Sequence, residues 1–173
     1  MATRTFLSKI GWDSDPTHNP KSDVYNAKKA FAAGKIFPVI NWTCSNIQNI
    51  QVGDKAYFKR VGNKPRGFFA RGFVISAEPQ LRRVDSINYS YLSEAYRDIF
   101  DGQFTVDIEW IEVVDYDKPL DTSELKNKQE FKGAFFAPRK SGSSFNEEYV
   151  DSLDRSWEEY LLESIKRGFG AKK

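Results

Sequence analysis

The chain has 173 residues, of which 40% are hydrophobic and 29% are charged, and its formal net charge is only +2. This length suits one domain with its own core, and the composition excludes a disordered chain. No apolar run approaches the roughly 20 residues that a membrane span needs, and the first residues lack the apolar region of a signal peptide. A single cysteine excludes an internal disulfide framework. We therefore expect one domain over residues 1–173, a cytoplasmic location and no membrane partner.

The first part of the chain predicts a strand and then a helix. Residues 5–12, "TFLSKIGW", predict a strand that the proline-rich "DSDPTHNP" breaks. Ser22 is a suitable N-cap for a helix over residues 23–33, and Gly34 is suited to end it.

The next part predicts an edge strand followed by a β-hairpin. Residues 35–42, "KIFPVINW", predict a strand, and Pro38 favours a place at the edge of a sheet or at the start of the strand. "KAYFKR" and "FFARGFVISAEP" flank a loop with two glycines and a proline, which predicts a hairpin over residues 55–79. Gly72 lies inside its second strand and indicates a bulge or a close backbone approach.

The middle of the chain is irregular and then strongly strand-like. The segment before residue 104 shows no clean period, and we expect a loop with one short helix over residues 93–100. Residues 104–117, "FTVDIEWIEVVDYD", alternate between apolar and polar side chains and predict a strand. The alternation slips at Trp110 and Ile111, as it would at a bulge.

The last part predicts a closing amphipathic helix. Ser144 and Glu147 form a capping box for a helix that reaches about residue 167, and Gly168 should end it. Irregular loops, and not regular crossover helices, separate the expected strands. The elements together predict an α+β fold with a small, curved, mostly antiparallel sheet or an open β-barrel and flanking helices.

Basic residues are concentrated in and around the predicted hairpin. Between residues 55 and 83 there are eight of them, opposed nearby only by Asp54 and Glu78. They are Lys55, Lys59, Arg60, Lys64, Arg66, Arg71, Arg82 and Arg83. Such a face on a nearly neutral chain is typical of a nucleic-acid-binding domain, but a solvated hairpin face would look the same.

Few residues suit catalysis. His18 is the only histidine and lies in a turn-rich segment, which disfavours Ser-His-Asp, Cys-His and zinc sites. Glu124 and Lys126, with Asp117 or Asp121 upstream, weakly match the acidic residues and lysine of metal-dependent nucleases. These residues lie in a polar segment that is predicted to be a loop and not a rigid strand. Since the sequence also has a single histidine and no metal-binding cluster of cysteine and histidine, we expect no enzyme activity, no metal and no cofactor.

Several motifs resemble the EVE domain of the PUA-like superfamily, which is related to the YTH readers of methylated RNA adenine. They are "WTCS" at the end of a strand, the hairpin "VGDKAYFKRVGNKPRGFFARGFV", the strand "FTVDIEWIEVVDYDKPL", and "APRKSGSSF" before the closing helix. The similarity covers residues 36–157, and the hairpin is its most specific part. It implies a PUA-like β-barrel with flanking helices. The similarity is greatest to EVE-like domains of modification-dependent restriction systems.

The resemblance also implies a function. It implies a non-catalytic domain that recognises a modified base flipped into an aromatic cage, with 5-methylcytosine or 5-hydroxymethylcytosine in double-stranded DNA favoured. A nuclease domain or subunit would be a further partner. The alternative that stays open is a PUA-like RNA-binding module that reads modified or structured RNA. A flipped base needs aromatic faces to replace its stacking, worth about 1–3 kcal/mol per base, and polar groups for its edge.

The resemblance assigns residues to the base pocket, and the distribution of basic residues indicates those that would contact phosphate. The modified-base pocket would contain Trp42, Cys44, Ser45, Asn46, Tyr89, Tyr91, Ser141 and Gly142. The nucleic-acid backbone would contact Lys59, Arg60, Lys64, Arg66, Arg71, Arg82, Arg83, Arg139 and Lys140. Judged from residue type alone, Trp42 could equally be a core tryptophan, Cys44 a small buried apolar residue, and the two tyrosines packing residues of a loop.

Overall fold

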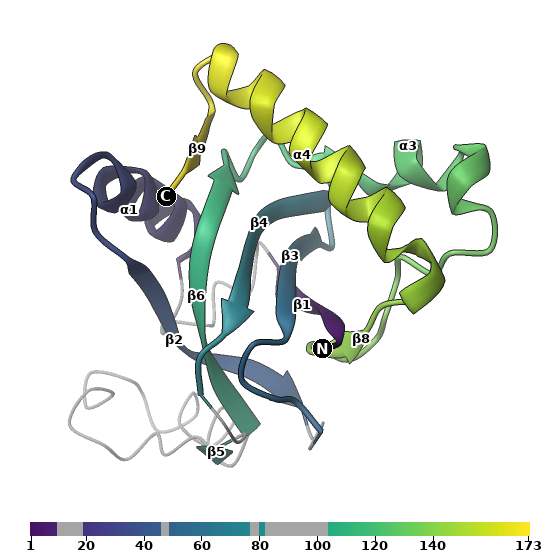
Figure 1. The fold of residues 1–173 in the computed structure, drawn as a ribbon, viewed down its shortest axis with the longest axis horizontal. Helices are drawn as coiled ribbons and strands as arrows, with labels where there is room; N and C mark the ends of the chain where they lie inside the picture. Colours follow the sequence, from purple (N-terminus) through teal and green to yellow (C-terminus); the bar gives the residue numbers. More distant parts are fainter. Residues whose placement is uncertain (10–18, 46–48, 77–79, 82–103) are drawn as a thin grey trace.

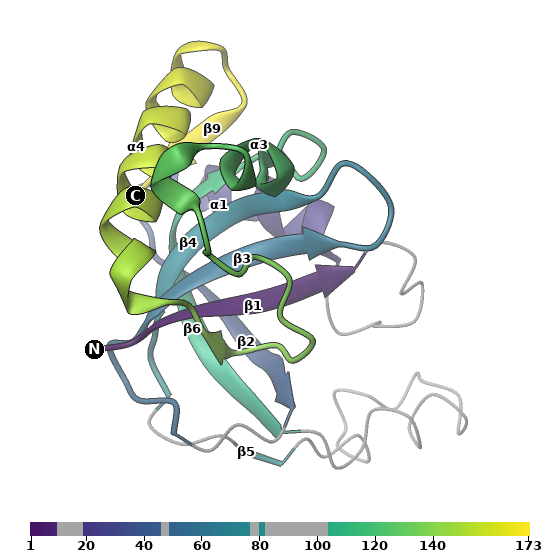
Figure 2. The same ribbon diagram turned by 90° about the vertical axis from the view of Figure 1, so that its right-hand side faces the viewer.

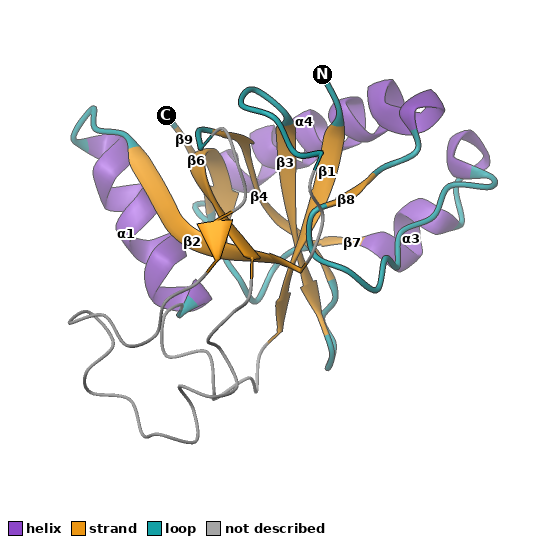
Figure 3. Ribbon diagram, turned by 90° about the horizontal axis from the view of Figure 1, so that it is seen from below, coloured by secondary structure: helices purple, strands orange, loops and turns teal. Residues whose placement is uncertain are grey.

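In the computed structural model, which describes residues 1–9, 19–45, 49–76, 80–81 and 104–173, a mixed sheet curls into a half-barrel with helices around it (Figures 1 and 3). The described strands are β1 (Thr3–Lys9), β2 (Phe37–Ser45), β3 (Lys55–Val61), β4 (Gly67–Val74), β5 (Gln80–Leu81), β6 (Phe104–Val114), β7 (Leu120–Asp121), β8 (Ser143–Ser144) and β9 (Gly170–Lys172). The described helices are α1 (Pro20–Ala32), α3 (Thr122–Lys126) and α4 (Val150–Lys166), with short 3₁₀ helices η2 (Gln129–Phe131) and η3 (Glu147–Tyr149). The α+β class with a curved sheet is thus confirmed.

The strand order in the sheet is β2-β6-β4-β3-β1-β8, with β5 and β9 paired to β6 and β7 paired to β4. Among the described pairings, β1 with β3 is parallel and the others are antiparallel. The β3–β4 hairpin is as predicted. Strand β2, which contains Pro38, lies at an edge of this order, where a residue without an N–H is tolerated.

The predicted bulge lies where β4 meets β6. Arg71 is opposite Glu112 and Gly72 is opposite Trp110, so Ile111 has no partner in β4. The slip in alternation at Trp110 and Ile111 is this irregularity, and it is confirmed.

The sheet packs on both of its faces. On β3, the Phe58 ring lies edge-on to Trp110, with ring centroids 5.3 Å apart, and Trp42 lies edge-on to Phe58 at 4.8 Å. The neighbouring Tyr57 points to the other face and contacts Trp157 of α4 at 6.0 Å. Alternate side chains of one strand therefore supply two apolar layers, one inside the half-barrel and one under α4, which crosses the sheet in Figure 1.

Both predicted helix starts are wrong. The side chain of Asn19, not that of Ser22, caps α1, because Pro20 at the first helical position needs no hydrogen bond and Asn19 accepts from the Ser22 N–H at 3.2 Å. Ser144 does not cap α4, because it is held in β8 opposite Arg4. The predicted ends are confirmed: Gly34 and Gly168 follow α1 and α4 with φ of +70° and +85°.

Within the described ranges, no helix is long and apolar enough to cross a membrane.

Gly72 offers a direct test of this packing. A Cβ at Gly72 would lie 2.0 Å from the backbone oxygen of Glu109 in β6, so Gly72→Ala must force β4 and β6 apart. We expect a loss of about 1–3 kcal/mol or more in the free energy of unfolding, measured by urea denaturation. Gly34→Ala is the control, since its Cβ has open space and only the positive φ is strained. A Gly72 variant as stable as wild type would contradict the close approach.

Candidate functional site

Two of the predicted pocket segments meet at one end of the sheet: the end of β2 and the loop before β8. Gly142, with φ of +90°, lies so close to β2 that a Cβ there would be 3.2 Å from the Cys44 Cβ and 3.2 Å from Ile50 Cδ1. Its N–H donates to the Thr5 carbonyl at 2.8 Å. The glycine lets the loop lie directly on the strand, since a side chain in this conformation would be strained and crowded.

Ser141 attaches the same loop to β1. Its hydroxyl oxygen accepts from the Leu7 N–H at 2.9 Å, and the residue is buried. The loop is therefore fixed on two sides before any ligand binds.

A buried ion pair, which we call the Arg4 clasp, joins this loop to the rest of the site. The Arg4 guanidinium donates to Asp54 Oδ2 at 2.7 Å, to the Gly142 carbonyl at 3.0 Å and to the Asn49 carbonyl at 3.0 Å. The Arg4 and Asp54 side chains are only 3% and 2% exposed. The clasp thus connects β1, the segment before β3 and the loop before β8. Sequence reasoning missed it, because Arg4 lies before the strand predicted over residues 5–12, whereas β1 begins at Thr3, and a single arginine carries no local signal.

The clasp keeps Asp54 ionised. Burial alone would raise the pKa of Asp54, but hydrogen bonds from Arg4 and from the Gln51 and Ala2 N–H groups, with the Arg4 charge, outweigh it and hold the pKa below its ordinary value.

Trp42 lies in the core. The residue is only 4% exposed, and its ring contacts Phe58 and Trp110, the latter with centroids 6.3 Å apart. Of the two interpretations that residue type left open, this packing favours the core tryptophan. A base could stack on the ring only after the surrounding side chains moved.

Cys44 is fully buried, and burial raises the pKa of its thiol to about 11, with the Arg4 charge acting in the opposite direction. It therefore packs as a small apolar side chain.

Asn46, Tyr89, Tyr91, Arg82, Arg83 and the predicted helix over residues 93–100 lie outside the described residues. The backbone of Ser45 is described and lies opposite Phe104 in β6.

The side chains of Lys59 and Arg60, which are predicted to contact phosphate, are buried and donate hydrogen bonds to protein groups. Each is 5% exposed. The Lys59 ammonium donates to the Phe136 carbonyl, and burial lowers the pKa of Lys59 to about 8. The Arg60 guanidinium donates to the Tyr116 carbonyl at 3.0 Å and to Asp117 Oδ1 at 3.1 Å. Their burial counts against contact with phosphate.

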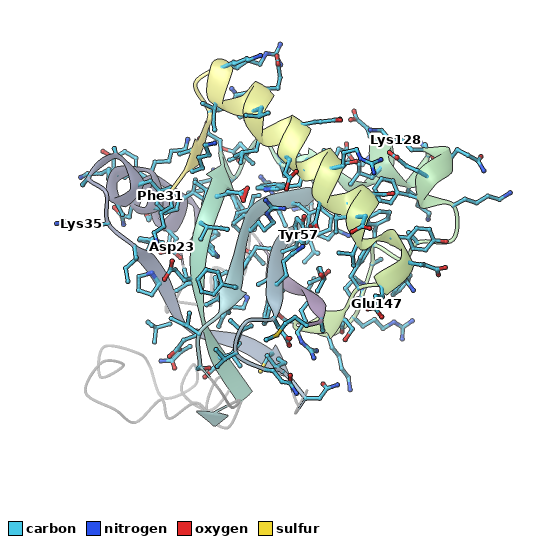
Figure 4. The ribbon with its side chains drawn as sticks, in the orientation of Figure 1. Asp23, Phe31, Lys35, Tyr57, Lys128 and Glu147 are labelled. Atoms are coloured by element: carbon cyan, nitrogen blue, oxygen red, sulfur yellow. The ribbon has the colours of Figure 1, made fainter. Side chains whose placement is uncertain are left out.

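Arg71, a third predicted phosphate ligand, holds α4 on the sheet. It donates to Glu112 Oε1 at 2.6 Å, and the Trp157 indole N–H donates to Glu112 Oε2 at 2.9 Å. The Tyr57 hydroxyl, which Figure 4 shows near α4, donates to Asp154 Oδ1 at 2.6 Å. These contacts use Arg71 for structure, with its side chain 12% exposed.

The other described basic residues of the predicted interface are exposed: Lys64, Arg66, Arg139 and Lys140. Lys64 and Arg66 lie in the β3–β4 turn, and Arg139 and Lys140 directly precede the loop that lies on Cys44.

The acidic residues of the weak nuclease pattern have structural contacts. Asp121 caps α3 by accepting from the Ser123 N–H at 2.8 Å, and Asp117 pairs with Arg60. No group of three or more His, Cys, Asp or Glu side chains able to hold a metal occurs in the described part of the chain.

The fold is similar to that of a solved structure, a hypothetical protein from Leishmania major. The TM-score is 0.54 at 19% sequence identity, and the match covers 91% of this chain and 97% of that chain. This likeness shows a shared fold and says nothing of function. No protein-family model and no curated protein sequence matches the chain. The half-barrel is compatible with a PUA-like fold, and the EVE resemblance stays a prediction.

The Arg4 clasp predicts a specific acid sensitivity. Asp54→Asn leaves a buried arginine without its counter-charge, so we expect a loss of about 3–5 kcal/mol in unfolding free energy at pH 7. Because the pKa of Asp54 is lower in the folded state than the unfolded value of 3.8, its stabilisation is complete above that pH and is lost as pH falls through the folded value.

Urea denaturation from pH 7 to pH 2 measures both effects. The variant should lose less stability than wild type on acidification, while Glu159→Gln, an exposed carboxylate on α4, should change neither property. Equal stability of wild type and Asp54→Asn at pH 7 would contradict the clasp.

Cys44 should be unreactive in the folded protein. With a pKa of about 11, roughly 0.1% of the thiol is ionised at pH 8, and the side chain is fully buried. We expect no alkylation by iodoacetamide at pH 8 within an hour and complete alkylation in 6 M guanidinium, detected by mass spectrometry. Fast labelling of the folded protein would show that this end of the sheet opens.

Proposed function

We propose that the protein is a non-catalytic nucleic-acid-binding domain that recognises a modified base at the end of the sheet where β2 meets the loop before β8. One observation carries the proposal: the two segments that the EVE resemblance assigns to the base pocket lie against each other at Cys44 and Gly142. They are distant in the sequence, and the Arg4 clasp fixes the loop.

The buried position of Trp42 changes how we assign the pocket. A base needs an aromatic face that it can reach, and Trp42 is packed on Phe58. We therefore assign Trp42 to supporting the site from the core, and Tyr89 and Tyr91 stay the predicted stacking residues. Ser45, Asn46 and the backbone near Gly142 would provide polar groups for the base edge.

The exposed cations beside this site are Arg139 and Lys140, which precede Ser141 in the same loop and would bind the nucleic-acid backbone. Lys64 and Arg66 lie in the hairpin turn, which follows the end of β3 that is far from Asp54, so they would contact the backbone away from the base. Their attraction to phosphate would offset part of the few kcal/mol that base flipping costs, and it should weaken as salt rises.

The favoured ligand is 5-methylcytosine or 5-hydroxymethylcytosine in double-stranded DNA, read in the cytoplasm within a modification-dependent restriction system. Cleavage would belong to a nuclease domain or partner subunit. A PUA-like reader of modified or structured RNA is the alternative, and contacts to the 2′-hydroxyl would distinguish it.

A binding screen tests the proposal. Fluorescence anisotropy at 50 and 200 mM salt would compare duplexes with cytosine, 5-methylcytosine, 5-hydroxymethylcytosine and N6-methyladenine at one position, and the matching RNAs. Burying one methyl group is worth about 0.8 kcal/mol, so we expect at least about a fourfold preference for one modified base. Arg139→Gln with Lys140→Gln should weaken binding to modified and plain duplexes alike.

Equal affinity for every modified and unmodified probe at both salt concentrations would refute base recognition. A preference found only among the RNA probes would select the alternative. Incubation of the same DNA with Mg²⁺ should leave it uncut.

A further inference from the structure

A second group of basic residues lies in the segment that follows β6 in the sequence and leads to β8, and only its last two members, Arg139 and Lys140, border the candidate pocket. Residues 118–140 contain six basic and three acidic side chains. The basic ones are Lys118, Lys126, Lys128, Lys132, Arg139 and Lys140, and the acidic ones are Asp121, Glu124 and Glu130. Figure 2 shows this segment, with α3, facing the viewer beside the β3–β4 hairpin. Two of the acidic residues have partners of their own. Asp121 caps α3, and Glu130 Oε2 lies 3.9 Å from Arg155 Nη1.

This surface displays one aromatic ring on a fixed backbone. Phe135 is 60% exposed, whereas the adjacent Phe136 is 6% exposed and contacts the rings of Phe131 and Phe145 at 5.4 and 5.5 Å. The Phe135 N–H donates to Asn146 Oδ1 at 3.1 Å. One exposed phenylalanine is not unusual. An exposed ring on a backbone fixed by this hydrogen bond, in a segment that carries several lysines, has the chemistry of a stacking platform.

The hairpin turn belongs to the same surface. Gly67 of β4 pairs with Asp121 of β7, and Lys59 of β3 donates to the Phe136 carbonyl. Electrostatics agree with this geometry, because the charge of Arg66 adds to burial in lowering the pKa of Lys59. Arg66 is therefore near the segment that carries Phe135.

We propose that Phe135, Arg66, Lys126, Lys128 and Lys132, which we call the Phe135 surface, bind a nucleic-acid strand, with one unpaired base stacked on Phe135 and phosphates on the cations. The combination of ring and cations matches the two parts of a nucleotide. A membrane surface would need more apolar area, and among the described residues of 118–140 only Phe135 is a large exposed hydrophobic side chain. Both this proposal and the proposed function have a nucleic acid as the partner, but this proposal requires no modified base.

Two variants with matched controls test it. The first replaces Lys126, Lys128 and Lys132 by glutamine, and its control replaces Lys29, Lys35 and Lys166, which removes the same charge elsewhere. Figure 4 shows Lys128 and Lys35 on opposite sides of the molecule. The second is Phe135→Ala, with Leu162→Ala as control, because Leu162 is 54% exposed on α4.

The probes are an unmodified 12-nucleotide single strand and the same sequence as a duplex, measured by anisotropy from 50 to 300 mM salt. The lysine variant should lower the salt slope for both probes by about one unit per lysine, and its control should not. Phe135→Ala should weaken single-strand binding about fivefold or more, with a smaller effect on the duplex. Thermal unfolding of each variant confirms that it is folded.

An unchanged salt slope in the lysine variant, or single-strand binding by Phe135→Ala within twofold of wild type, would overturn the proposal. So would stronger binding to phosphatidylserine vesicles than to either oligonucleotide. If these variants behave as expected while no modified base is preferred, base recognition fails and the Phe135 surface stands. If a modified base is preferred and the variants bind like wild type, the Phe135 surface fails alone.

Discussion

The candidate pocket depends on one buried interaction, the ion pair between Arg4 and Asp54. Burying two charges is costly unless their donors and acceptors are used. Here the Arg4 guanidinium also donates to the carbonyls of Asn49 and Gly142, and Asp54 accepts from the backbone of Gln51. These contacts exist only when β1, the segment before β3 and the loop before β8 are in place together. The parallel pairing of β1 with β3 positions Arg4, so the N-terminal strand organises a site whose predicted ligand contacts come from elsewhere.

The basic residues divide into two groups with different tasks. Lys59, Arg60 and Arg71 satisfy buried carbonyls and carboxylates and fix the fold. Those in the hairpin turn and in residues 118–140 are largely at the surface. The acidic residues of α4 are also used in part for packing, as Asp154 is by Tyr57. The surface formed by the hairpin turn and residues 118–140 is therefore more positive than the net charge of +2 for the whole chain indicates.

Local patterns predicted local structure well. The positions of glycine and proline predicted the edge strand, the bulge at Gly72 and both helix ends, because each of these features follows from the backbone geometry around one residue. The helix starts were wrong, because Asn19 caps α1 in place of Ser22, and because Ser144 is paired in β8 while none of the described side chains caps α4. The role of Arg4 could not be predicted, and residue type left open whether Trp42 is a core or a pocket residue, since both are set by segments distant in the sequence. The hairpin cations showed the same limit: Lys59 and Lys64 look alike in sequence, but only Lys59 faces a buried carbonyl.

The central claim is that nucleic acid binds where the end of β2 meets the loop before β8. Hydrogen-exchange mass spectrometry with and without a saturating oligonucleotide, taken as the tightest ligand from the binding screen, tests it most directly. The account predicts slower exchange in peptides covering residues 42–46 and 139–144, with α1 unchanged. Protection confined to α1 or α4, with none in those two segments, would contradict it.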